Sequence, residues 1–161
     1  LAILPLFATS AAVAPVEPDR DATATVRIPA PASYRKLQDL HFAYLGVTAA
    51  GTATIDPNTD TMTTTGGVTH LGGLPYAALF TGISPGSNIV IIRIPKQPIT
   101  LTRAGGTETM TVSNWTLSGD ARRTVVIREP FEFKVGGTLN VNAGQVEGTY
   151  VGTFTVDVQY P

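Results

Sequence analysis

Few residues in this chain are of a type that could do chemistry, and they are scattered. The sequence has two histidines, His41 and His70, and no cysteine. His41 lies in an apolar stretch, which favours a structural role, and His70 lies beside two glycines, which favours an exposed turn. Their spacing matches no metal-binding pattern. The sequence also lacks a nucleophile elbow and a phosphate-binding loop. It therefore predicts no catalytic residue, no metal site, no cofactor and no small-molecule substrate.

Two short motifs imitate functional sites. Residues 56–60 (DPNTD) resemble the start of a calcium-binding loop, but Thr61 stands where that loop requires glycine and Gly67 where it requires glutamate. Aspartate, proline and asparagine favour turns, so we expect a plain hairpin turn there. Residues 114–116 (NWT) match the glycosylation triplet. We interpret Trp115 as an anchor of the hydrophobic core.

Charge excludes one class of partner. The net charge is −1, and only 14% of the residues are charged. The densest basic group is Arg122, Arg123 and Arg128, which we interpret as solvated surface residues. A nucleic-acid-binding domain carries a clear excess of positive charge. We therefore expect no nucleic-acid partner.

The composition and the spacing of turn-forming residues predict a single all-β domain. The 161 residues include 16 glycines and 12 prolines, and threonine, valine and isoleucine are abundant. Short runs with strand-like composition follow one another between turn signals, and none has the apolar period of a helix. This pattern is typical of a β-sandwich or barrel. The predicted strands are residues 22–28, 37–45, 51–55, 62–69, 76–83, 88–94, 99–102, 107–117, 123–128, 131–135, 138–141 and 149–160.

The N-terminal region has two parts. Residues 1–14 are apolar and then small, which is typical of a secretory signal or of a retained apolar arm, so we expect an exported protein. Residues 22–28 then alternate strictly, as in a strand with one buried face, and two prolines follow them. The inward set is Ala22, Ala24, Val26 and Ile28.

The C-terminal region also alternates. From Gly148 onward, one face carries Tyr150, Phe154, Val156, Val158 and Tyr160, and the other face carries polar residues. Alternation alone predicts only an ordinary amphipathic strand.

The segments ATATV, DPNTD, TTTGGVT, MTVSNW, FKVGGTLNV and GTYVGTFTVDVQY resemble a family of secreted Gram-negative domains of unknown function. The resemblance covers about 140 residues. A glycine fourteenth from the end, alternating apolar residues and a penultimate tyrosine are also similar to the C-terminal motif of chaperone–usher pilins, and the related spore-coat-U-type pilins tend to be encoded near periplasmic chaperones and ushers. Unlike many pilins, this chain has no disulfide.

This resemblance implies an incomplete immunoglobulin-like sandwich that is completed by a donated N-terminal strand. It implies a pilus subunit on the cell surface, reached through the periplasm, with identical subunits, a periplasmic chaperone and an outer-membrane usher as partners. Ala22, Ala24, Val26 and Ile28 would form the donor strand. The acceptor edge, which also binds the chaperone, would consist of Gly148, Tyr150, Phe154, Val156, Val158 and Tyr160.

The expected organisation is a signal remnant or arm at 1–21, a donor extension at 22–31 and the pilin-type domain at 32–161. Three other functions are open. The first is a self-complemented surface module whose own first strand completes its sandwich. The second is an adhesin, which would need an exposed aromatic cluster or a metal site. The third is a hydrolase, for which the sequence offers no catalytic group. The sequence leaves open whether the donated strand acts within one chain or between chains.

Overall fold

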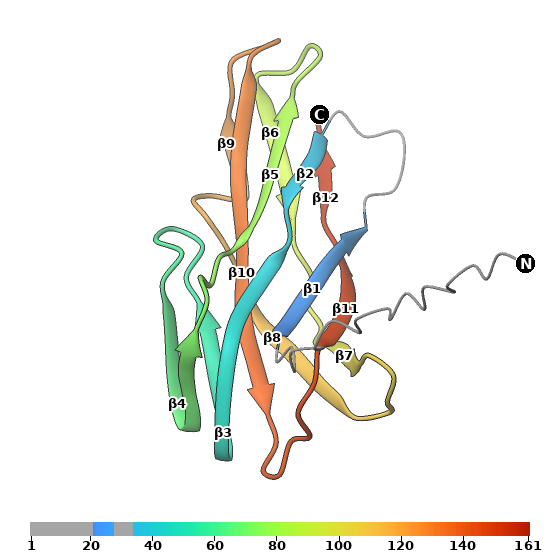
Figure 1. The fold of residues 1–161 in the computed structure, drawn as a ribbon. Coiled ribbons are helices and arrows are strands. Elements are labelled where there is room, and N and C mark those ends of the chain that lie inside the picture. The colour runs from blue at the N-terminus through green and yellow to red at the C-terminus, as the bar shows by residue number, and fades with distance from the viewer. Residues whose placement is uncertain (1–20, 28–33) are drawn as a thin grey trace, which may run out of the picture.

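A computed structural model of the chain describes residues 21–27 and 34–161, which form twelve β-strands and no helix (Figure 1). The all-β prediction is confirmed. None of these residues belongs to a helix that is long and apolar enough to cross a membrane. The strands are β1 (Asp21–Arg27), β2 (Tyr34–Gln38), β3 (Leu40–Ile55), β4 (Met62–Gly72), β5 (Ala78–Ile83), β6 (Ile89–Arg93), β7 (Ile99–Arg103), β8 (Thr109–Leu117), β9 (Arg122–Thr124), β10 (Pro130–Val141), β11 (Tyr150–Thr155) and β12 (Asp157–Gln159).

Within the described part of the chain, six strands close into a barrel in the order β3–β10–β8–β7–β11–β1 and back to β3. We call these six strands the ring. The long strand β10 closes it, because its second half pairs with β3 and its first half pairs with β5 outside the ring. Strand β4 lies outside β3, and β2 lies outside β5. The strands β12, β6 and β9 form a separate small sheet.

Several predicted strands are joined or divided in the structure. The two strands predicted at 131–135 and 138–141 form the single strand β10, and the glycine pair between them continues it. A Cβ on Gly136 would lie 2.3 Å from the Ile55 carbonyl oxygen, so glycine allows β3 to approach β10 closely there. The strand predicted at 149–160 is instead divided at Val156 into β11 and β12. This division moves the chain from the ring to the small sheet.

The N-terminal half shows the same kind of difference. The strand predicted at 37–45 is interrupted at Asp39, so that its first part belongs to β2 and the rest to β3. Strand β3 then runs on for 16 residues and includes the strand predicted at 51–55. Ala43 has a positive φ of 58° and lies where the pairing of β3 with β1 shifts register, between His41 and Tyr44, as in a β-bulge. The bulge gives β3 one more residue than β1 over this stretch.

One hydrophobic core fills the ring and extends towards the small sheet. Phe80 and Phe133 stack with ring centroids 4.9 Å apart, where β5 pairs with β10. Trp115 is partly buried and packs on Phe154 with a centroid distance of 4.6 Å, in agreement with its predicted role as an anchor. The largest fully buried side chains are Tyr150, Phe42, Phe80, Phe133, Phe154, Leu40, Ile55, Ile92, Leu101 and Leu139.

Tyr34 ties β2 to the point where the C-terminal segment changes sheet. Its side chain is buried, and its hydroxyl donates a 2.6 Å hydrogen bond to the carbonyl oxygen of Val156. Burial raises the pKa of Tyr34, and the negative charge of Asp157 raises it further. The neutral phenol is therefore the form that the folded state holds.

We expect Tyr34→Phe to lower the free energy of unfolding at neutral pH by about 1–2 kcal/mol, because it leaves a buried carbonyl without its donor. Since the pKa of Tyr34 is raised in the folded state, its contribution is complete below the ordinary tyrosine pKa of about 10 and is lost as pH rises through the folded value. Urea unfolding of both proteins between about pH 7 and pH 11 tests this. The two stabilities should converge above about pH 10, and a constant difference across the range would contradict the assignment.

Candidate functional site

The histidines have structural partners. His41 stacks on Tyr76 with centroids 4.9 Å apart, and its Nδ1 lies 3.2 Å from the Leu74 carbonyl oxygen. The Nε2 atom of His70 lies 3.0 Å from the carbonyl oxygen of Gly72. Among residues 21–27 and 34–161, no three histidine or acidic side chains gather as they would around a metal ion.

The DPNTD segment is a hairpin turn, and its side chains bond both within the turn and to neighbouring segments. The Asp56 carboxylate accepts a 2.8 Å hydrogen bond from the Asn58 backbone N–H, and the Asp56 carbonyl accepts one from the Asp60 N–H. The Asp60 carboxylate accepts from the Ala77 N–H at 3.0 Å and pairs with the ammonium of Lys134. The predicted hairpin turn joins β3 to β4, and both carboxylates form contacts within the protein.

The feature with functional potential is the position of β1. This strand lies between β11 and β3, parallel to β11 and antiparallel to β3. Figure 1 shows β1 and β11 side by side (blue and red), although they come from opposite ends of the sequence. We call the space between β11 and β3 the slot. Without β1, both strands would have an unpaired edge and the ring would be open.

The inward face of β1 is the predicted one. Ala22, Ala24 and Val26 are buried, with exposed fractions of 3%, 0% and 7%. Along β11 they lie opposite Tyr150, Gly152 and Phe154 in turn. The alternation predicted for both segments is therefore confirmed over this length. Ile28, the fourth predicted donor residue, lies outside the described residues.

The wall of the slot has two large aromatic side chains with a glycine between them. Tyr150 and Phe154 are buried on β11, and Trp115 supports Phe154 from behind. Between them, a Cβ on Gly152 would come within 2.5 Å of Leu101 and 2.6 Å of the Thr100 carbonyl oxygen on β7. Glycine is thus required for β7 to lie close to β11.

A carboxylate holds the end of β1. The Val26 backbone N–H donates a 3.2 Å hydrogen bond to Oδ1 of Asp39, and the same oxygen pairs with the Lys36 ammonium at 2.6 Å. Asp39 is the residue that separates β2 from β3. The last residues of β1 and β3 that pair in the sheet are Ala24 and Leu40. Asp39 provides a hydrogen-bond acceptor for the backbone of β1 just beyond this pair. The sequence gives no local signal for this contact, because Asp39 and Val26 are 13 positions apart.

The predicted acceptor residues divide into two groups. Tyr150 and Phe154 line the slot, and Gly148 comes just before β11 with a positive φ of 149°, where a Cβ would meet the Arg103 side chain. The other three lie beyond the slot. Val156 is buried at the change of sheet, Val158 pairs across from Ile92 of β6, and Tyr160 packs edge-on against Phe131.

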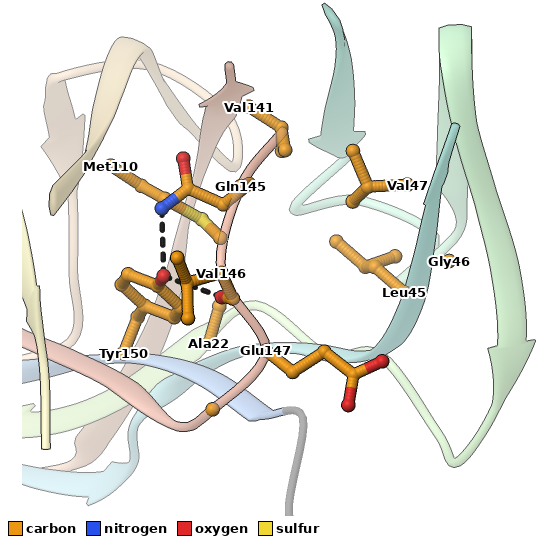
Figure 2. Close-up of a pocket in the computed structure, with 11 residues that line it drawn as sticks. Ala22, Leu45, Gly46, Val47, Met110, Val141, Gln145, Val146, Glu147 and Tyr150 are labelled. Carbon is orange, nitrogen blue, oxygen red and sulfur yellow. Dashed lines mark hydrogen bonds between the residues drawn. The ribbon is translucent and has the colours of Figure 1, made fainter. Parts of the chain in front are cut away.

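A cavity of about 180 Å³ adjoins the start of β1. Figure 2 shows Leu45 and Val47 facing Val146 across it. The floor is closed by Tyr150, whose hydroxyl donates to the Val146 carbonyl at 2.6 Å and accepts from the Gln145 amide at 2.7 Å. Because Ala22 also lines this cavity, the slot is not fully packed at the end that holds the start of β1.

The slot between β11 and β3 holds a strand. Comparisons with known proteins show which part of the chain belongs to a known family. A family model described as "Domain of unknown function (DUF4402)" matches residues 32–160. The chain belongs to this family. The predicted resemblance to a domain family of unknown function is thereby confirmed. Comparisons with curated proteins and with solved structures give no match. The DUF4402 match includes β11 and β3, which form the slot, and begins after β1, which fills it.

Ala24→Asp tests the importance of the slot for this DUF4402 chain. Ala24 is fully buried opposite Gly152, so an aspartate would place an unpaired charge in the core and should lower the free energy of unfolding by about 3 kcal/mol or more. The control is Thr25→Asp, whose side chain points outward on the same strand and which should cost about 0.5 kcal/mol. Urea unfolding measures both, and equal effects would contradict the inward assignment.

Proposed function

We propose that this domain is a non-catalytic structural subunit of a bacterial surface fibre, in which the first strand of one copy fills the slot of the next. In this proposal the domain is an incomplete immunoglobulin-like sandwich, and β1 is the donated strand. Identical subunits are the partners in the fibre. A periplasmic chaperone and an outer-membrane usher act during export and assembly, and the fibre lies at the cell surface.

The observation that carries the proposal is that the strand that closes the ring precedes the family domain. The DUF4402 match starts at residue 32, whereas β1 ends at Arg27. Without β1, the part of the chain that the family shares would leave one edge of β11 and one edge of β3 unpaired, and the strand that pairs with both edges lies before the matched residues. A copy of β1 from a neighbouring subunit offers the same side chains and the same backbone groups.

The energetics suit a reversible or kinetically held strand. Burial of Val26 contributes about 1.5–3 kcal/mol, and the two alanines contribute less. Each ladder hydrogen bond to β11 or β3 adds about 0.5–1.5 kcal/mol. The cavity beside Ala22 removes contacts at one end of the strand. These terms are sufficient to hold subunits without a covalent link, and small enough for a chaperone strand to replace β1.

A second function has its own supporting observation. Within this single chain, β1 occupies the slot of the same molecule. That placement favours a self-complemented surface module, which would be a stable monomer and would bind its target through another surface. The two functions differ in whether β1 fills the slot of its own molecule or the slot of a neighbouring subunit.

Gel electrophoresis in SDS of protein taken from its native cell surface separates the two. We expect unboiled samples to form a ladder that collapses on boiling to one band near 16.9 kDa, or slightly less after removal of a leader. Ala24→Asp should abolish the ladder, whereas Thr25→Asp should keep it. A single monomer band in both wild-type lanes would overturn the fibre and favour the self-complemented module.

A further inference from the structure

The two ends of β1 are held in the slot by different contacts. At its start, Ala22 lines the cavity together with Leu45 and Val146 (Figure 2), so part of its surroundings is empty space rather than packed side chains. The pairing with β3 is also irregular there, because β3 has an extra residue between His41 and Tyr44. A bulge of this kind disrupts the hydrogen-bond ladder locally. The start of β1 therefore combines incomplete packing with an interrupted ladder.

The end of β1 is held by a larger side chain. Val26 is buried opposite Phe154, whose ring packs on Trp115 with a centroid distance of 4.6 Å. A buried valine removes more apolar surface from water than a buried alanine does, so it stabilises the strand more. The apolar contacts of β1 are therefore stronger at Val26 than at Ala22.

A charged group also acts at this end. Oδ1 of Asp39 accepts from the Val26 backbone N–H at 3.2 Å and pairs with the Lys36 ammonium at 2.6 Å. We call this carboxylate with its two bonds the clamp. The side chains of Lys36 and Asp39 are 28% and 32% exposed, so water screens their attraction only in part. A hydrogen bond to an ionised acceptor stabilises more than one between two neutral groups.

We propose that β1 opens from its start, beside the cavity, and that the clamp keeps its end in the slot until last. Asp39 is thus a positioning residue, which acts through the Val26 backbone and controls how often the end of β1 leaves β11 and β3. The inference concerns β1 in the slot of its own molecule. It therefore goes beyond the proposed fibre and stands or fails without it.

Hydrogen exchange of backbone amides reports the opening of each half of β1 separately. Successive N–H groups of a strand point to opposite sides, towards its two neighbours. Because the Val26 N–H points to Asp39 on the β3 side, the N–H groups of Thr23 and Thr25 point towards β11. The clamp includes neither of these two amides, so a change in their exchange reports movement of the strand rather than loss of the bond to Asp39.

The wild-type full chain tests the order of opening without any substitution. We expect the Thr23 amide to exchange about tenfold faster than the Thr25 amide, or more, because a bond to a charged acceptor holds only the second half of β1. NMR spectra recorded after transfer to D₂O give both rates, each divided by the rate of the same amide in an unstructured chain. Equal rates, or a faster rate at Thr25, would overturn the proposed order.

Asp39→Ala tests the clamp itself. It should speed exchange at Thr25 about tenfold and leave Thr23 within about twofold of wild type, because the start already opens while the clamp is intact. Asp39→Asn keeps a side-chain oxygen that can accept from Val26, so it should restore most of the protection of Thr25. The matched control is Asp120→Ala, an exposed carboxylate in the loop before β9, which should change neither rate.

Two results in Asp39→Ala would overturn the clamp. An unchanged rate at Thr25 would show that the carboxylate does not hold the end of β1. An equal acceleration at Thr23 and Thr25 would show that β1 opens as one unit and that Asp39 only stabilises the fold. Because the SDS ladder reports exchange between copies and these rates report opening within one molecule, failure of the clamp and failure of the fibre are distinguishable.

Discussion

The pairing of β1 with β11 and β3 is the constraint on which the rest of the structure depends. It closes the ring, and it satisfies the backbone groups of two strands that would otherwise have open edges. It also covers Tyr150 and Phe154, on which the packing of Trp115 and of the neighbouring strands relies. The side chains that β1 buries are nevertheless few and mostly small. The Asp39 carboxylate accepts a hydrogen bond at one end of the strand, and a cavity adjoins the other end.

That combination is compatible with the proposed fibre as well as with a self-complemented monomer. The slot recognises backbone groups and an alternating pattern of small residues, and nothing in its contacts requires the strand to come from the same molecule. The glycine of β11 opposite Ala24 allows β7 to lie close to β11 there. Local concentration favours the chain's own strand, and in the proposed fibre a high concentration of subunits would favour a neighbour's strand.

Local pattern was enough to predict the strand faces and turns, but not the way in which strands join. Alternation identified Ala22, Ala24 and Val26, and also Tyr150 and Phe154, as inward residues because the side-chain period of a strand is two. Turn chemistry identified the bend at Asp56. In contrast, the union of two predicted strands across Gly136, the division at Val156 and the clamp from Asp39 to Val26 depend on partners far away in sequence. A single sequence carries no local signal of such pairings.

The most direct test of strand exchange uses the absence of cysteine from the chain. Thr25 and Thr153 are register partners on β1 and β11, so cysteines placed there are in range of a disulfide. One chain with Thr25→Cys and another with Thr153→Cys are refolded together and oxidised, with Thr25→Cys and Thr100→Cys as the control pair. Exchange predicts a disulfide-linked heterodimer in clear excess over the control. No excess, together with complete intrachain bonding in the Thr25→Cys/Thr153→Cys double variant, would contradict exchange and leave β1 as a strand of its own molecule.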